Sequence, residues 1–360
     1  MNIEYYSSAA MVASVVIYLL ALIAHAAEWA AARRSPVEEQ ADDRELVGVG
    51  AAGGSVGARS VGAGSSAGAA GSVSDAGSAG SGRTGGGNAA DGADLSGTAT
   101  LDAAMERRVS EMRVELWGRI GVAMTVIGFL LSLTGTVLRG LAAGRPPWGN
   151  MYEFTITAMT MVVAVYLVMV WRFGARWLGL PVALLAAIGN GLAVTVFYVA
   201  VAPLVPALHS VWFIIHIVAA AIAGAAFNVG ALLTVVFLIR QRAEKKGKVG
   251  GYLARIPNAR KLDLLAYRFH AFAFPLWTFT VAAGAIWAEY AWGRYWGWDP
   301  KETWALVTWV IYACYLHARS TAGWRGTRAA VIALIGVASF WFNFVGINLL
   351  VSGLHSYAGI

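Results

Sequence analysis

Long apolar segments recur along the chain, and they constrain its fold more than any other feature. A helix needs about 20 mostly apolar residues to cross roughly 30 Å of hydrocarbon. Inside a membrane every backbone polar group must find an internal partner, which a helix provides. Eight segments meet this requirement, near residues 8–30, 117–140, 152–171, 178–200, 211–239, 264–288, 302–318 and 329–350. The sequence therefore predicts an all-α polytopic membrane protein with about eight transmembrane helices.

Basic residues are divided unequally between the loops on the two sides of this bundle. Cytoplasmic loops are enriched in lysine and arginine. The loops on one side hold most of these residues, and those on the other side hold only Arg139, Arg145, Arg294 and Lys301. We therefore expect the poorer side and both chain ends to face outward from a plasma or inner membrane, into a periplasm-like space or a lumen. The net charge of +7 reflects these loops and predicts no nucleic-acid partner.

Composition divides the chain into three parts. Residues 46–100 are rich in glycine, serine and alanine and contain almost no large apolar side chain. Such a segment buries too little surface to offset its chain entropy. We predict an N-terminal transmembrane helix over 1–30 and a seven-helix membrane domain over 116–360. Between them we predict a disordered cytoplasmic linker over 31–115, which gains helical character from residue 101.

The chain has a single cysteine, Cys314, within an apolar run. An internal disulfide, a paired-cysteine redox reaction and covalent haem of the c type on this sequence are therefore excluded. We expect Cys314 to be a small buried core residue.

The loop between the sixth and seventh spans, residues 287–304, holds five tryptophans and two tyrosines in 18 residues. Aromatic belts at membrane interfaces are usually less dense. Indole rings stack on flat π-systems and their N–H groups bond polar edges, while Arg294 and Lys301 are suited to pair with carboxylates. The loop predicts a platform for a large flat ligand. Haem fits this inventory, and so would a quinone or another flat amphiphile.

Histidines separate these ligands. His216 lies a turn or two inside the outer end of the fifth span, and His355 follows the eighth span on the same side. Histidines within membranes tend to be functional, and two imidazoles beside an aromatic platform are what axial ligation of haem iron requires. His209 is also external and only seven residues from His216, so chemistry alone does not choose between them.

His317 occupies a different depth. It lies about 15 residues below the outer end of the seventh span, which is roughly 22 Å at about 1.5 Å per residue. It therefore cannot share a haem with the outer pair. It either ligates a second haem or lies at the inner interface beside Arg319. We expect structural roles for His25 and His270.

Acidic residues on the outer side are expected to stabilise local structure. Asp299 and Glu302 follow the aromatic run, and acids favour a helix N-terminus. We expect them to make turn and helix-start contacts, with proton donation as the alternative role. Glu153 is expected to form an ion pair with Arg139 or Arg145.

Five segments resemble, in order, those of the CcsA/ResC family, the haem-handling membrane subunit of the system II cytochrome c synthase. The resemblance covers roughly residues 117–360. The segments are PPWGNMYEF at 146–154, PLVPALHSVWFIIHI at 203–217, YRFHAFAFPLWT at 267–278, WGRYWGWDPKETWAL at 292–306, and FNFVGINLLVSGLHSYAG at 342–359.

The resemblance implies roles for individual residues. His216 and His355 are implied to be external axial ligands of haem b, and His317 to ligate an inner haem used during export. The porphyrin-contacting surface implied in the tryptophan-rich loop comprises Trp292, Trp296, Trp298, Asp299 and Trp304.

The resemblance also implies partners. These are a CcsB/ResB-type membrane subunit that supplies the second inner ligand, an apocytochrome c with a Cys-x-x-Cys-His motif, and a thiol-reducing thioredoxin-like protein. The predicted function is to export and hold haem and, as part of this synthase, to attach it to apocytochrome c. A haem exporter without ligation activity is the first alternative. A cytochrome b-type electron-transfer subunit is the second, but such proteins pair their histidines in mid-membrane.

Overall fold

The computed structural model describes residues 2–33, 90–321 and 323–355. Helices dominate these ranges, and no strand is present in them. Among these residues, those up to 33 and from 108 onward belong to one compact unit, and residues 90–107 belong to a second. Most of the predicted linker, residues 34–89, lies outside the described residues.

All eight expected helices are present in the described part of the chain. They correspond to α1 (Ile3–Arg33), α2 (Ala90–Ala143), α3 (Met151–Phe173), α4 (Gly179–Thr195), α5 (Val211–Lys245), α7 (Ala259–Trp292), α8 (Pro300–Ser320) and α9 (Thr327–Trp341) with α10 (Ile347–Leu350). Short turns join them, namely η1 (Arg176–Leu178), η2 (Pro206–Leu208), α6 (Tyr252–Arg255) and the π-helical turn η3 (Phe342–Gly346) between α9 and α10.

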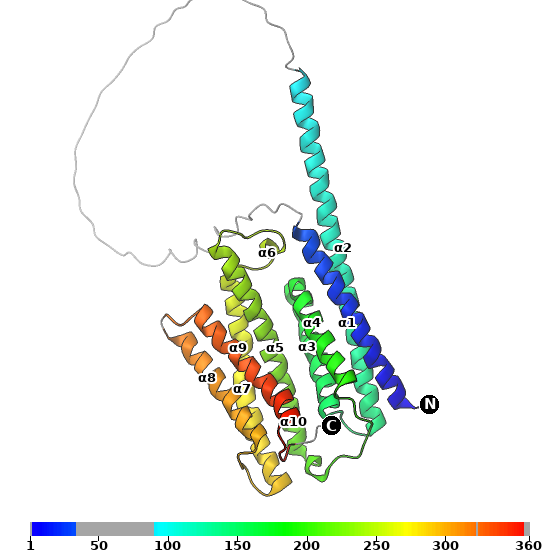
Figure 1. Ribbon diagram of the computed structural model, residues 1–360, viewed down its shortest axis with the longest axis vertical. Helices are drawn as coiled ribbons and strands as arrows, with labels where there is room; N and C mark the ends of the chain where they lie inside the picture. Colours follow the sequence, from blue (N-terminus) through cyan, green and yellow to red (C-terminus); the bar gives the residue numbers. More distant parts are fainter. Residues whose placement is uncertain (1, 34–89, 322, 356–360) are drawn as a thin grey trace, which may run out of the picture. The chain divides into compact units, whose positions relative to one another are not determined.

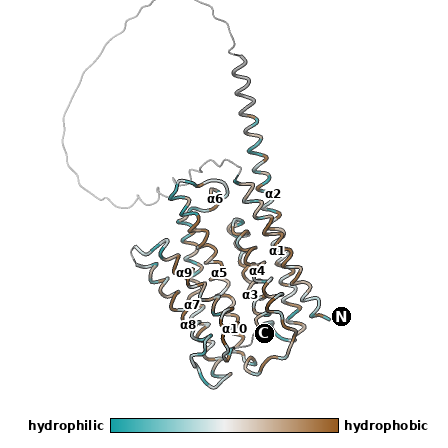
Figure 2. Tube along the Cα trace, viewed as in Figure 1, coloured by the Kyte–Doolittle hydropathy of each residue, from teal (hydrophilic) through white to brown (hydrophobic). Residues whose placement is uncertain are grey.

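The helices of the compact unit form two groups. Figure 1 shows α1 to α4 on one side and α5, α7, α8 and α9 on the other. The most extensive pairing is between α5 and α7, while α3 contacts both α4 and α5 and so joins the groups. Apolar residues run along the helices and polar residues gather at their ends, as Figure 2 shows. This distribution is typical of a membrane protein, because lipid-facing surfaces must be apolar.

Seven of the helices in the described ranges are long and apolar enough to cross a membrane. The chain is thus an all-α polytopic membrane protein, as expected. The helix α8, expected as a further span, has 21 residues but is not among the seven. Its tryptophans, tyrosines and polar residues lower its hydropathy.

Several helix boundaries and one side-chain placement differ from expectation; α5 and α7, for example, extend beyond the expected residues 239 and 264. The helix α4 ends at Thr195 rather than near residue 200, where β-branched residues and Pro203 follow. The helix α2 begins at Ala90 rather than 101, consistent with the ease of propagating a helix once it is nucleated. The prediction that Cys314 is buried is wrong, because its side chain is exposed. The buried face of α8 carries Thr308, Tyr312, Tyr315 and Ala318, and Cys314 falls on another face.

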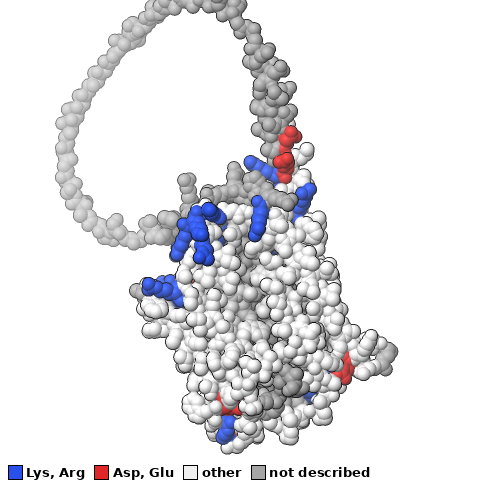
Figure 3. Space-filling model, viewed as in Figure 1, with Lys and Arg blue, Asp and Glu red and all other residues white. Residues whose placement is uncertain are grey.

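Charge separates the two ends of the bundle. Figure 3 shows lysine and arginine gathered around one end of the bundle and few at the other. The basic end includes the last turns of α1, α3, α5 and α8, which carry Arg33, Arg172, Arg242, Lys245 and Arg319. The opposite end carries the tryptophan-rich loop and the start of α3.

Candidate functional site

A deep pocket opens at the end of the bundle opposite the basic one. Its empty space of about 1200 Å³ includes open solvent at the mouth, so the chemistry of its walls indicates what it can hold. Its walls come from α3, α5, α7, α8, α9, η3 and α10 and from the loops at this end, and they are mainly apolar and aromatic. The pocket is therefore suited to a large and mostly apolar ligand.

His216 and His355 both line this pocket. The imidazole of His216 lies nearly parallel to the Trp287 indole, with ring centroids 5.7 Å apart and an interplanar angle of 23°. The His355 ring meets the same indole edge-on at 5.4 Å. One tryptophan thus contacts both histidines, although 139 positions separate them in the sequence.

Hydrogen bonds fix the orientation of both imidazoles through the same ring nitrogen. The Nδ1 atom of His216 lies 2.9 Å from the carbonyl oxygen of Thr280, to which it donates when protonated. The Nδ1 atom of His355 lies 2.8 Å from Oδ2 of Asp299. Within the described residues, the Nε2 atoms of both rings make no hydrogen bond. A bond that holds Nδ1 leaves Nε2 of a neutral imidazole available as a metal ligand.

Close packing at Gly284 keeps the His216 ring in place. A Cβ atom added at Gly284 would lie 2.8 Å from Nδ1 of His216, which is closer than non-bonded atoms tolerate. Glycine at this position of α7 therefore allows the imidazole of α5 to approach the neighbouring backbone.

Asp299 links His355 to the start of α8. Its Oδ1 atom accepts a hydrogen bond from the backbone N–H of Leu354, and its Oδ2 atom accepts one from Lys301 N–H. Burial alone would raise the pKa of the Asp299 carboxyl, but the bonds from His355 and from the two backbone groups lower it to about 2. The carboxylate is therefore ionised at neutral pH and orients His355.

The expected helix-start role of Asp299 and Glu302 is confirmed. Asp299 is the N-cap of α8, and the two residues form a capping box. The Asp299 carboxylate accepts from backbone N–H groups of the first turn, and the Glu302 carboxylate accepts from the backbone N–H of Asp299. Glu302 also accepts from Gly297 N–H and pairs with Arg294 at 3.1 Å. Arg294 therefore stabilises the loop itself. Of the two basic residues predicted to pair with a ligand, Lys301 lines the pocket and Arg294 does not.

The aromatic residues of the loop separate into two sets. Trp296 lines the pocket, and Trp292 packs edge-on against His355 at 4.8 Å. Trp298 is 69% exposed and has a positive φ of 58°, and it contacts only Trp296 among the described aromatic rings. Trp304 packs on Phe342 outside the pocket walls. The structure thus places Trp292 and Asp299 against His355 and Trp296 in the pocket wall, while Trp298 and Trp304 do not line the pocket.

The other histidines lie elsewhere. His209 caps η2, is exposed, and does not line the pocket. His317 lies in the last turn of α8 at the basic end and is exposed. His25 and His270 are fully buried between helices, and each contacts a neighbouring polar side chain.

A known protein family matches the part of the chain that forms the pocket. The family described as Cytochrome C assembly protein matches residues 148–355, from the first pocket tryptophan to the second pocket histidine. The chain belongs to this family. The protein therefore acts in cytochrome c assembly.

Relatives of the assembly family support the same conclusion. The cytochrome c biogenesis protein CcsA of Chlamydomonas reinhardtii is 38% identical over 242 residues, which cover 66% of this chain and 67% of the relative. CcsA of Gloeobacter violaceus is 35% identical over 298 residues, 68% of this chain and 88% of the relative. CcsA of Mesostigma viride is 35% identical over 269 residues, which cover 68% of this chain and 87% of the relative.

Several residues of the pocket in this assembly protein were not singled out in the sequence. Trp148, Trp277, Phe340 and Phe344 all line it. They come from a loop, from α7 and α9 and from η3, where each is one aromatic residue among many. Trp148, Trp277 and Phe344 belong to segments that resemble the family, and this was the available signal.

A buried ionic network holds the loop that carries Trp148. The Glu153 carboxylate, which is fully buried, pairs with Arg139 at 3.0 Å and with Arg145 at 2.7 Å, whereas an ion pair with one or the other was expected. It also accepts from the backbone N–H of Gly149 at 2.8 Å. Asn150 caps α3 by accepting from Glu153 N–H.

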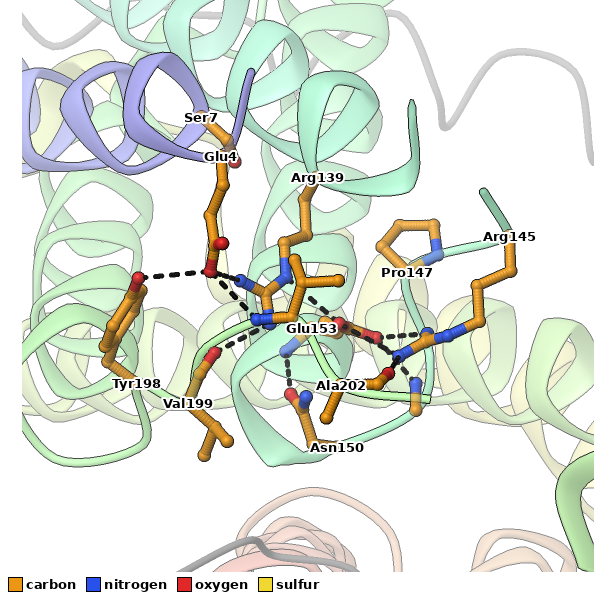
Figure 4. Close-up of polar contacts among 12 residues, drawn as sticks. Glu4, Ser7, Arg139, Arg145, Pro147, Asn150, Glu153, Tyr198, Val199 and Ala202 are labelled. Atoms are coloured by element: carbon orange, nitrogen blue, oxygen red, sulfur yellow. Dashed lines mark hydrogen bonds and ion pairs between the residues drawn. The ribbon is translucent and has the colours of Figure 1, made fainter. Parts of the chain in front are cut away.

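The network extends to the start of α1 and to the loop after α4. Figure 4 shows the Arg139 guanidinium between Glu4 and Glu153. Arg139 also donates to the carbonyl oxygen of Val199, and Arg145 donates to that of Ala202. Two arginines and two glutamates balance in charge, which a buried cluster requires. Because Gly149 and Asn150 line the pocket, this network positions one of its walls.

Proposed function

We propose that this protein holds haem b in the pocket, with His216 and His355 as the axial ligands of the iron. The observation that carries the proposal is the placement of two imidazoles in one aromatic pocket, each held through Nδ1 and each with a free Nε2. Bis-imidazole ligation suits a haem that must be retained and then released, because protein ligands exchange without breaking the macrocycle. The indoles and apolar walls exclude water from the ring.

In the proposed reaction the haem is the substrate. An apocytochrome c presents a reduced Cys-x-x-Cys-His segment at the pocket mouth, and its histidine replaces one of the two axial imidazoles. Each cysteine thiol adds across one vinyl group, with sulfur bonding one carbon and the thiol proton ending on the other. This addition neither oxidises nor reduces the partners. The pocket contributes mainly by holding thiol and vinyl together, since proximity supplies much of the rate.

Orientation follows from the charge asymmetry. Basic residues gather at the end away from the pocket, and cytoplasmic loops carry such residues. We therefore assign the pocket to the outer side of the cell's plasma or inner membrane. His317, exposed on α8 at the basic end, is assigned to an inner site that receives haem for export. Its exposure suits a second ligand from a CcsB/ResB-type membrane subunit.

Thiol reduction is assigned to another protein. Cys314 is exposed on α8, away from the pocket, and the sequence contains no second cysteine. A thioredoxin-like protein would keep the two apocytochrome cysteines reduced, because a thiol can add across a vinyl group whereas a disulfide cannot.

Reconstitution tests this function. The full chain is produced together with the companion membrane subunit and an apocytochrome c, and haem is measured by absorbance before and after extraction with acidified acetone. The proposal expects a low-spin haem spectrum on the purified complex and haem in the cytochrome that resists extraction. Haem bound to the complex without extraction-resistant product identifies an exporter instead. A complex that stays colourless when supplied with haem rejects both.

Gly284→Val is expected to lower the haem retained by the purified protein by about 10-fold, a typical effect of disturbing a group that orients a metal ligand. The added side chain displaces the His216 ring, because even a Cβ atom there would lie 2.8 Å from Nδ1. Pyridine haemochrome absorbance per mole of protein measures the change. Gly191→Val in α4 is the matched control, since no atom lies within 4 Å of a Cβ at that position. Equal haem content in the two variants would contradict the assignment of His216.

A further inference from the structure

Lys301 places an unpaired positive charge in the pocket wall. It is the only lysine or arginine among the residues that line the pocket in the described ranges. Its Nζ atom donates to Oδ1 of Asn348 at 2.8 Å, and no carboxylate of the described chain lies within ion-pair distance. An ammonium group with one neutral partner has capacity for two further hydrogen bonds.

Neither nearby acid forms an ion pair with Lys301, because the side chains of both are bonded to other groups. Asp299 accepts from His355 and from two backbone N–H groups. Glu302 pairs with Arg294 and completes the cap of α8. Burial lowers the pKa of the Lys301 ammonium to about 8, an effect that Asp299 opposes in part, so the group remains protonated at neutral pH.

A π-helical turn brings two asparagines to the same wall. The turn η3 spans Phe342–Gly346, and residues five apart follow one another on one face of such a turn. Asn343 and Asn348 both line the pocket. Asn343 is only 7% exposed, and its Oδ1 atom has no partner among the described residues. A buried acceptor without a donor is costly, and rotation of the amide would place the N–H₂ group there instead, where it can donate to a ligand oxygen.

We propose that Lys301, Asn343 and Asn348 form a subsite for a carboxylate group of the ligand. The Lys301 ammonium supplies the charge, and rotation of the Asn343 amide presents its N–H₂ group to the carboxylate oxygen. Asn348 holds the lysine by accepting from Nζ. The pocket then selects flat macrocycles that carry a free carboxylate and rejects their neutral counterparts. This inference rests on the proposed haem-binding function. It assigns the carboxylate-bearing edge of the macrocycle to the wall formed by these three residues.

A thermodynamic cycle between ligand and side chain tests the subsite. The full chain in detergent micelles is titrated with iron protoporphyrin IX and with its dimethyl ester, whose carboxylates carry no charge, and the Soret band reports binding. The natural protein should bind the free acid about 10- to 100-fold more tightly than the ester, the usual range for a charge-assisted hydrogen bond. Lys301→Met should remove this preference and leave the affinity for the ester within about twofold.

Three further variants make the outcome unambiguous. Lys301→Arg should keep most of the preference because it keeps the charge. Asn343→Leu should lower the preference about fivefold by removing one neutral hydrogen bond. Lys261→Met, at the exposed start of α7 at the basic end, should leave it unchanged.

The possible failures are distinguishable. Equal binding of acid and ester by the natural protein overturns the subsite and leaves the haem site standing. A preference that survives Lys301→Met also overturns it. If Lys301→Met binds neither compound, Asn343→Leu decides, and an unchanged preference in that variant rejects the subsite. Failure of the natural protein to bind either compound rejects the proposed function itself.

Discussion

Replacing His216 and His355 together by glycine is expected to abolish the low-spin haem spectrum and to stop covalent haem attachment to apocytochrome c. Loss of a group that merely orients a ligand costs about 10- to 100-fold in metal affinity, so loss of both ligands should exceed about 100-fold in retained haem. Absorbance of the purified complex and extraction-resistant haem in the cytochrome measure the two effects.

Two controls separate ligation from folding. His209→Gly removes an exposed imidazole that lies outside the pocket and should leave both readouts unchanged. Free imidazole added to the double variant should restore part of the low-spin spectrum, because each glycine leaves space for an imidazole beside its former hydrogen-bond acceptor. Covalent product that persists in the double variant without added imidazole would contradict the assigned ligands.

Glu153→Gln is expected to destabilise the protein by about 3–5 kcal/mol, the usual cost of leaving a buried charge without its partner. Among the described residues, the neutral side chain would leave Arg139 with Glu4 as its acid partner and Arg145 with none. It would also weaken the acceptor for Gly149 N–H in the pocket wall. Chemical unfolding in detergent micelles, followed by tryptophan fluorescence, measures the change.

Glu115→Gln is the matched control for this substitution. Glu115 also pairs with two arginines, Arg119 and Arg176, but its side chain is 44% exposed. Exposed ion pairs contribute about 0–1 kcal/mol because water screens them. Similar losses of stability in the two variants would show that burial of the Glu153 network contributes little.

The helices could be predicted from the sequence because hydropathy sets their length and position. Every expected segment is a helix, including α8, whose tryptophans and tyrosines make it less apolar than the other spans. The boundaries were less predictable, because backbone propagation and local β-branched residues decide them. The wrong prediction for Cys314 has a different cause: an apolar run does not show which face of its helix packs against the core.

The residue types of the candidate site could be predicted from the sequence, but which individual residues line the pocket could be predicted only in part. A loop dense in tryptophan and two histidines indicated one region, and the structure brings His216, His355 and Trp296 to the walls of one pocket, with Trp292 and Asp299 against His355. The density of indoles did not show which rings point inward. At Trp298 a left-handed backbone conformation turns the side chain outward. Trp148 and Phe344 reach the pocket only through the packing of distant helices.

The route of the chain around the pocket has a consequence for its biosynthesis. One imidazole is contributed by α5 and the other follows α10, and the indole between them belongs to α7. A partly inserted polypeptide therefore places only one of the two imidazoles in the pocket until α10 has joined the bundle. Under the proposed function, haem in the outer pocket therefore reports that the described helices through α10 have assembled.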